Sequence, residues 1–234
     1  MAARREATRA DAGAGDTVVE QASLAARVGA SPRSRIRRHA ERTAPAEEVE
    51  RILRAGRVAH VAYALDGQPY VIPFTYDYAD GAIYLHGAPA SRTLKALRGG
   101  MDVAIEVTLL DGLIASRDAE SHSANYRAVV VYGRAGRVTN MAEKRAILER
   151  MTLRYFPGRT VGTDYEAATE KQMRALEVLR VPVMELGAKM RTGGPRGPRD
   201  AYPTAPGTAY VVELGGYDEF IFLSWAISSN LKSC

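Results

Sequence analysis

Two Asp-Gly dipeptides constrain the fold of this chain more than any other feature, because each falls between two segments with the pattern of β-strands. Asp66-Gly67 separates residues 57–64 from residues 68–78, and Asp80-Gly81 separates residues 68–78 from residues 82–86. Asp-Gly favours the two-residue turn of a tight hairpin, in which both central residues take positive φ. The three segments therefore predict an antiparallel meander.

Periodic patterns beyond the meander predict more strands and several helices. Residues 103–109 alternate apolar and polar side chains, and residues 126–138 contain four consecutive apolar positions. A further strand is expected at residues 176–186, and helices are expected at residues 43–56, 92–98, 142–155 and 164–175. Together they predict a mainly β protein with flanking helices, in which about six antiparallel strands close into a small barrel. Such a barrel has little interior room, so a large ligand must bind outside it or between subunits, which favours a homodimer.

Composition argues against several classes of protein. The chain has a formal net charge of +5, but residues 1–42 hold nine arginines and five acidic residues, so the remainder is almost neutral and no nucleic-acid partner is expected. The single cysteine, Cys234, cannot form an internal disulfide or a cysteine-based metal cluster. A reducing, cytoplasmic location and no metal site are expected. No apolar run approaches the roughly 18 residues that span a bilayer, so no membrane partner is expected.

Residues 83–97 read as a strand, a short turn and a helix that offers donors for an anion. The strand ends at His86, Gly87 and Pro89 interrupt it, and Ser91 can cap the following helix. A helix start exposes backbone N–H groups, and Arg92, Thr93 and Lys95 add further donors in its first turn and a half. A phosphate monoester fits such a cradle. The alternative is an ordinary capped helix whose basic residues are simply solvated.

Several separate motifs resemble one protein family. They are GQPYVIPFTYDYADGAIYLHGA followed by SRT, TLLDGLIASRDAESHSANYRAVVVYGRA at residues 108–135, RHAER at residues 38–42, and KMRTGGP at residues 189–195. These motifs resemble the flavin-binding split-barrel superfamily that includes pyridoxamine 5′-phosphate oxidase. The closer likeness is to the branch that contains nitroimidazole-resistance (Nim) proteins and flavin-nucleotide-binding proteins. The likeness covers about residues 37–200.

The resemblance also suggests how the chain is divided. It implies a six-stranded antiparallel split β-barrel of the FMN-binding type at residues 43–200. Residues 1–42, rich in Ala and Arg, are expected to be a disordered tail. Residues 201–234 form an extension that departs from the family, in which Trp225-Ala226-Ile227 is at best a displaced remnant of a family strand.

The resemblance implies a set of residues that bind the flavin. The ring is expected along the second strand, which supplies Val71, Ile72, Pro73, Phe74 and Thr75. Pro73 agrees with a strand edge, because proline lacks one ladder donor. The phosphate is expected at Ser91, Arg92, Thr93 and Lys95, although Thr93 stands where the oxidase has Lys. Arg127 is expected to approach the phosphate or the pyrimidine edge from either subunit.

Histidines are the residues most open to opposite interpretations. His86 is the candidate catalytic and cofactor-contacting residue, as a flavin contact, a proton donor or a haem ligand, and the alternative is a structural residue held by a hydrogen bond. His122, Asn125 and Tyr126 form a second polar cluster with Arg127, which would otherwise serve to cap a loop. His60 has alternating apolar neighbours and is expected to be a partly buried barrel residue.

The leading functional hypothesis is an FMN-dependent oxidoreductase that is Nim-like and acts on an unidentified small substrate. A flavin enzyme needs few catalytic side chains, because the ring itself accepts hydride or electrons. The alternative is a non-catalytic flavin- or haem-binding protein, a sensor or carrier, that uses His86. Oxidation of pyridoxamine phosphate is disfavoured, because the chain ends WAISSNLKSC instead of carrying the substrate-binding Arg-Leu-x-Pro segment. The chain lacks a dinucleotide fingerprint, a Walker loop, a His-Glu-x-x-His motif and a Gly-x-Ser-x-Gly elbow.

Overall fold

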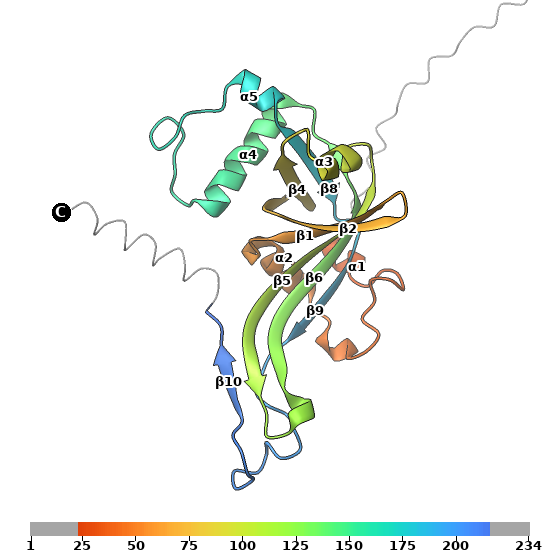
Figure 1. Cartoon of the computed structure of the whole chain (residues 1–234), viewed down its shortest axis with the longest axis vertical. Coiled ribbons are helices and arrows are strands. Elements are labelled where there is room, and N and C mark those ends of the chain that lie inside the picture. The colour runs from red at the N-terminus through yellow and green to blue at the C-terminus, as the bar shows by residue number, and fades with distance from the viewer. Residues whose placement is uncertain (1–22, 216–234) are drawn as a thin grey trace, which may run out of the picture.

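Two antiparallel sheets dominate the computed structural model, which describes residues 23–215 (Figure 1). The larger sheet has the strand order β2-β1-β5-β6-β9, and β10 pairs with the far half of β5. Its strands are β1 (Ala59–Leu65), β2 (Gln68–Phe74), β5 (Asp102–Ala115), β6 (Ser123–Arg134), β9 (Glu185–Arg191) and β10 (Tyr210–Glu213). The smaller sheet has the order β3-β4-β8-β7. Its strands are β3 (Tyr76–Ala79), β4 (Ala82–Gly87), β7 (Gly136–Arg137) and β8 (Glu177–Pro182). The mainly β class and the split barrel are confirmed, whereas the expected closure of about six strands into a single barrel is wrong, because the strands of residues 23–215 form two separate sheets.

Both predicted tight turns are confirmed. Asp66 and Gly67 have φ values of 52° and 77°, and Asp80 and Gly81 have values of 51° and 65°. Positive φ at both central residues is the type I′ geometry that suits the twist of paired strands. The Asp-Gly pairs thus form hairpins between β1 and β2 and between β3 and β4.

The expected single strand at residues 68–78 is wrong, because it divides at Thr75 into β2 and β3, which belong to different sheets. The Tyr155 hydroxyl lies at this division. It accepts a hydrogen bond from the Tyr76 N–H at 2.9 Å and lies 2.7 Å from the Arg57 carbonyl oxygen, to which it can donate. A side chain from a distant helix therefore satisfies backbone groups that a continuous strand would pair with a neighbour.

Two helices pack against the sheets, each burying its apolar side chains in a different hydrophobic cluster. Helix α2 (Ala46–Ala55) buries Val49, Ile52 and Leu53 in the main core, which lies between the sheets. Helix α4 (Met141–Tyr155) packs on the smaller sheet and buries Ile147 and Met151 in a second cluster. The short helix α3 (Arg92–Leu97) connects β4 to β5. In Figure 1, α4 and the short α5 (Glu170–Arg174) lie at one end of the molecule, opposite the tip of the β5–β6 hairpin.

Three other expected elements have different bounds. The helix expected at residues 164–175 is confined to α5, and residues 156–169 before it form an irregular segment. The strand expected at 176–186 is two strands, β8 and β9, in different sheets, and the strand expected at 126–138 is β6 followed by the short β7. The chain changes sheet where β6 crosses β8, and apolar periodicity does not encode this exchange.

The packed part of the chain begins before residue 43. Residues 23–42 carry a short helix, α1 (Leu24–Arg27), and a 3-10 turn, η1 (Ala40–Arg42). The Gly29 N–H donates to the Leu186 carbonyl at 2.8 Å, and the Glu185 carboxylate accepts hydrogen bonds from Ser31 and Arg33. These contacts tie the segment to β9. Residues 1–22 of the expected tail and Trp225-Ala226-Ile227 lie outside the described residues.

No helix within residues 23–215 is long and apolar enough to cross a membrane.

Candidate functional site

Strand β2 is an edge strand of the larger sheet, as Pro73 predicts. Its side chains alternate. Val71 is 61% exposed and Pro73 and Thr75 are also exposed, whereas Ile72 and Phe74 are half-buried against the main core. The backbone groups on the unpaired side of β2 are therefore left for a ligand or another chain. All five residues predicted to lie beside the flavin ring fall on this strand or at its end.

Tyrosines place the start of α3 beside β2. Tyr63 and Tyr70 face each other across the β1–β2 hairpin, with stacked rings 5.1 Å apart. The Tyr63 hydroxyl is 3.0 Å from the Thr93 hydroxyl, and the Arg92 guanidinium lies 5.0 Å above the Tyr70 ring. The predicted anion cradle thus lies next to the predicted ring site. Sequence reasoning missed both tyrosines, although their symmetric places around Asp66-Gly67 were a signal.

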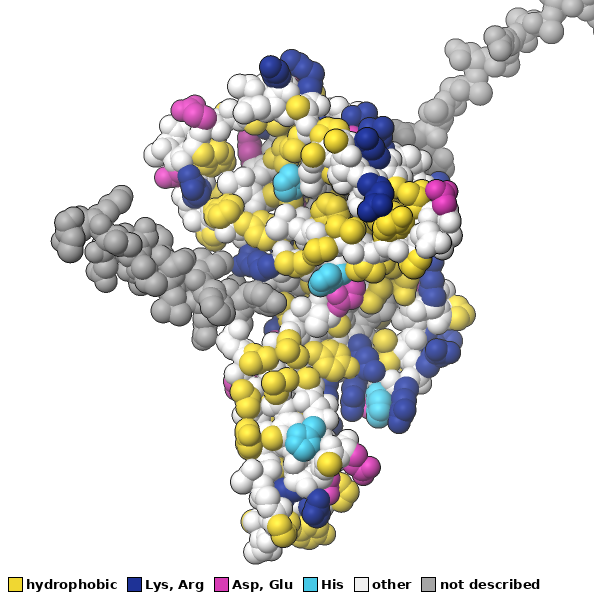
Figure 2. All heavy atoms as spheres, viewed as in Figure 1, with side chains coloured by type: hydrophobic (Ala, Val, Ile, Leu, Met, Phe, Trp, Pro, Cys, Tyr) yellow, Lys and Arg dark blue, Asp and Glu magenta, His cyan; other side chains and the backbone are white. Residues whose placement is uncertain are grey.

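Within the cradle the residues have different roles. Ser91 caps α3, and its hydroxyl accepts a hydrogen bond from the Leu94 N–H at 3.5 Å. Thr93 is buried against Tyr63, so its hydroxyl already has a partner. Arg92 and Lys95 are exposed. Figure 2 shows basic side chains close to α3, beside hydrophobic side chains over β2. The positive charge available for an anion therefore comes from Arg92 and Lys95.

His86 is the second-last residue of β4 and lines a cavity of about 440 Å³ beneath α4. The other lining residues are Thr75, Leu148, Met151, Thr152, Tyr155, Phe156 and Leu176. The imidazole Nδ1 is buried and has no hydrogen-bond partner among the described residues. Burial lowers the pKa of His86, so the ring is neutral near pH 7. A neutral imidazole can hydrogen-bond a ligand or coordinate a metal.

Arg127 is not brought to the other predicted site residues within one chain. It lies on β6, which β1 and β5 separate from β2. Its guanidinium makes two hydrogen bonds to the Asp111 carboxylate, at 2.6 and 2.9 Å, and these raise the pKa of Arg127. Asp111 sits at an irregularity of β5. The sequence pattern did not identify this partner.

The second predicted cluster lies at the far end of the β5–β6 hairpin. The Asn125 amide donates to the Gly193 carbonyl at 3.1 Å, and its oxygen accepts from Arg191 at 2.8 Å. His122 Nδ1 lies 3.1 Å from the Ala119 carbonyl. Tyr126, the third member, pairs with Arg191 across β6 and β9. This cluster joins loops, as its structural alternative predicts.

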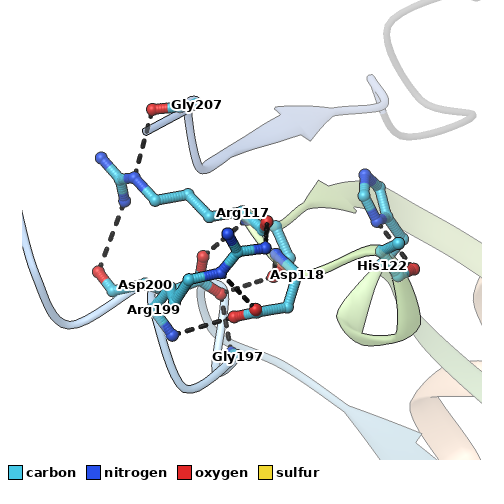
Figure 3. Close-up of polar contacts among 9 residues, drawn as sticks. Arg117, Asp118, His122, Gly197, Arg199, Asp200 and Gly207 are labelled. Carbon is cyan, nitrogen blue, oxygen red and sulfur yellow. Dashed lines mark hydrogen bonds and ion pairs between the residues drawn. The ribbon is translucent and has the colours of Figure 1, made fainter. Parts of the chain in front are cut away.

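A polar network extends this junction to the segment that precedes β10 (Figure 3). Asp200 accepts hydrogen bonds from the backbone N–H groups of Arg117 and Gly197 at 2.8 and 2.7 Å, and Arg199 binds Asp118 through its Nε at 2.6 Å. The hydrogen bonds from Arg199 lower the pKa of Asp118. Arg199 and Asp118 form an ion pair, and the Asp200 carboxylate and the Arg117 guanidinium bind backbone groups of the same loops, so the network holds the loop in place.

The expectation that His60 is a partly buried barrel residue is wrong. Its side chain is 51% exposed on the outer face of the larger sheet, and its Nδ1 lies 3.2 Å from the Glu106 carboxylate. The apolar neighbours that suggested burial, Val61 and Ala59, point to the opposite face, because successive side chains of a strand alternate.

The predicted site residues lie in the part of the chain that matches a known protein family. The family model described as pyridoxamine 5′-phosphate oxidase matches residues 45–190. The chain belongs to this family. The match spans β2, α3, His86 and Arg127, so every predicted site residue of this pyridoxamine 5′-phosphate oxidase family member lies inside it. No curated protein matches the chain.

Solved structures resemble the chain over most of its length. The flavocytochrome Anf3 from Azotobacter vinelandii is 30% identical with a TM-score of 0.68, and the match covers 79% of this chain and 85% of that one. The FAD and haem binding protein from Mycobacterium smegmatis is 30% identical with a TM-score of 0.66, and the match covers 72% and 81%. A candidate 5-nitroimidazole antibiotic resistance protein from Bacteroides thetaiotaomicron is 24% identical with a TM-score of 0.49, over 61% and 82%.

Proposed function

We propose that the protein is a flavin-dependent oxidoreductase that binds FMN along the edge of β2, with the phosphate at the start of α3. The observation that supports this most is the placement of Arg92, an exposed cation whose guanidinium lies 5.0 Å above the Tyr70 ring of the edge strand β2, with the exposed Lys95 three residues further along α3. When bound, the flavin would supply hydride or electron transfer to a small substrate. Ser91 and the two cations would hold the phosphate, and the backbone from Val71 to Thr75 would position the ring.

A second copy of the chain would complete this site. The outer face of the larger sheet has small residues in direct register, Ala62 opposite Ala104, and the exposed Val71 lies opposite Ala62 on its other side. Such a face suits close packing against an identical sheet. Arg127 of the second copy would then approach the flavin. Light scattering after size-exclusion chromatography should give twice the 25.4 kDa of the chain; a 25.4 kDa species with stoichiometric flavin would contradict this arrangement.

The Arg92→Ala variant tests the phosphate site. Loss of charge-assisted hydrogen bonds worth about 1.5–3 kcal/mol should weaken FMN binding roughly 10- to 150-fold, while riboflavin, which lacks the phosphate, should bind as before. Arg174→Ala removes an exposed arginine from another short helix and serves as the matched control. Flavin fluorescence quenching at one salt concentration measures both ligands. Equal FMN affinities in the two variants would remove this assignment.

The identity of the flavin needs its own measurement, because one 30%-identical structure is described as binding FAD. Chromatography of the flavin released by denaturation separates FMN from FAD. FMN is the expected result. Recovery of FAD would overturn the FMN assignment and keep the flavin, whereas a colourless protein that binds neither would overturn both.

Haem is the second candidate, with His86 as the ligand, and the protein would then serve as a sensor or carrier. It is favoured by the unpartnered Nδ1 in an apolar cavity and by the two 30%-identical structures, one described as a flavocytochrome and the other as haem-binding. A Soret band near roughly 400 nm that is lost in His86→Ala would support it. Absence of the band after reconstitution with haem would exclude it. The absence of flavin-dependent turnover would favour the carrier role.

A further inference from the structure

A second cavity, of about 390 Å³, lies between α4, α5 and the irregular segment that precedes α5. It shares three wall residues with the His86 cavity, namely Leu148, Thr152 and Leu176. The two cavities are therefore neighbours along one face of α4, with these shared side chains forming part of the wall of each. Neither the family match nor the predicted site residues assign a role to this α4–α5 cavity.

Most polar groups around the α4–α5 cavity already have partners inside the protein. The Gln172 side-chain oxygen accepts from the Thr169 backbone and hydroxyl, each at 2.8 Å. The Thr152 hydroxyl donates to the Leu148 carbonyl at 3.0 Å. Arg145 donates to the Ala168 carbonyl at 3.1 Å and pairs with an acidic residue of α5. These groups gain little from a ligand, so the cavity offers mainly apolar contact.

The charges near the cavity argue against a charged occupant. Glu149 and Glu166 are exposed at its rim, and Arg145 is already paired with Glu170. An anionic group would meet the two carboxylates, and a cation inside would lose its hydration against Leu148 and Met173. The chemistry of this cavity therefore favours an uncharged apolar group.

The His86 cavity differs in one respect, because the buried imidazole Nδ1 of His86 has no hydrogen-bond partner within residues 23–215. We propose that the two cavities together bind one molecule, with a hydrogen-bonding head at His86 and an uncharged apolar tail between α4 and α5. Thr75, at the end of β2, also lines the His86 cavity, so the head would lie next to the strand proposed to hold the flavin. If the protein is the proposed flavin-dependent oxidoreductase, this molecule would be its substrate, and that role rests on the proposed function. The binding of the molecule does not depend on the proposed function.

Alkylphenones of increasing chain length provide the test, because each has one carbonyl acceptor and an uncharged tail. Their affinities for the full-length protein can be measured by displacement of the fluorescent probe N-phenyl-1-naphthylamine. Each added methylene should tighten binding about fourfold until the tail fills the α4–α5 cavity. His86→Phe should weaken every member of the series by a similar factor, about 2- to 10-fold, because it removes the head contact only.

Two variants locate the tail. Leu148→Trp fills the wall between the cavities, so long alkylphenones should bind no better than short ones. Leu153→Trp makes the same change in the same helix at a side chain that is 51% exposed, and it should leave the series unchanged. If Leu148→Trp does not fold, Val161→Trp, at a 41% exposed wall position, should shorten the series instead.

Three results would overturn the inference. They are affinity independent of chain length in the unaltered protein, equal effects of Leu148→Trp and Leu153→Trp, and a probe that binds only after haem is removed. The last would make haem the occupant at His86. Failure of the proposed function is distinguishable, because a protein that binds no flavin but keeps the chain-length dependence loses the flavin assignment and retains this site.

Discussion

Replacing Gly133 with alanine tests how tightly the two sheets pack where β6 of the larger sheet crosses β8 of the smaller one. Gly133 lies in β6 where it crosses β8, and a Cβ atom there would be 2.2 Å from the Pro182 carbonyl oxygen and 2.8 Å from a Val181 methyl carbon. Ordinary contacts begin at 3.4 Å, so the strands must move apart by roughly 1 Å. Overpacking of this kind costs about 1–3 kcal/mol. For a domain of this size the melting temperature should fall by about 2–12 °C.

Gly136→Ala is the matched control. The nearest atom to its Cβ would be the Arg180 carbonyl oxygen at 4.0 Å, and neither Gly133 nor Gly136 has a positive φ. Each alanine lowers the conformational entropy of the unfolded chain, which stabilises the folded state by about 0.4–1 kcal/mol in both variants. The difference in stability between the two variants therefore measures the cost of the steric clash at residue 133. Calorimetry and urea unfolding should both show that Gly133→Ala is less stable than Gly136→Ala. Equal unfolding midpoints for the two variants would show that β6 and β8 can move apart without loss of stability, and would refute the prediction.

Three further predictions concern stability. Tyr155→Phe removes the acceptor of the Tyr76 N–H, so urea unfolding should show a loss of about 1–3 kcal/mol, whereas Tyr202→Phe, at a 64% exposed residue, should change stability by less than about 0.5 kcal/mol. Because burial lowers the pKa of His86, its neutral form stabilises the fold above pH 6.5, and this contribution should be lost as the pH falls below 6.5; His86→Phe should show a smaller loss between pH 7.5 and 5.5. Hydrogen bonds from Ser31 and Ser34 lower the pKa of Glu185 to about 2, so the protection factors of amides in residues 23–42, which compare exchange with the intrinsic rate at each pH, should fall as the pH falls from about 4.5 towards 2 and should already be low in Glu185→Gln at pH 7.

Local signals predicted the parts of the fold that depend on neighbouring residues. Asp66-Gly67 and Asp80-Gly81 require only their own backbone conformation, and both formed the expected turns. Ser91 caps α3 through the Leu94 N–H, three residues away, as the residue types suggest. In each case the partners are within a few positions along the chain, so sequence spacing describes them well.

Distant partners explain most of what sequence reasoning missed. The bidentate pair of Arg127 and Asp111 depends on the register of two long strands, and it places Arg127 away from β2 within one chain. His60 was expected to be partly buried because of its apolar neighbours, but the face of a residue follows from strand alternation and from which side of the sheet faces the core. The structure places α3 beside β2, as a site shared by these two elements requires, and the sequence did not predict the distant partners of Arg127 and His60.

The division at Thr75 connects the edge of β2 to the cavity beneath α4. If residues 68–78 formed one strand, β2 would continue in the larger sheet and its end would not turn towards His86. Instead, the Tyr155 hydroxyl binds backbone groups at the division, and both Tyr155 and Thr75 line the His86 cavity. The same side chain thus divides the strand and forms the cavity wall. Tyr155→Phe removes the hydrogen bonds that hold this division, so it should alter both the affinity for flavin at β2 and the affinity for alkylphenones at His86. Arg92→Ala should alter only the affinity for flavin.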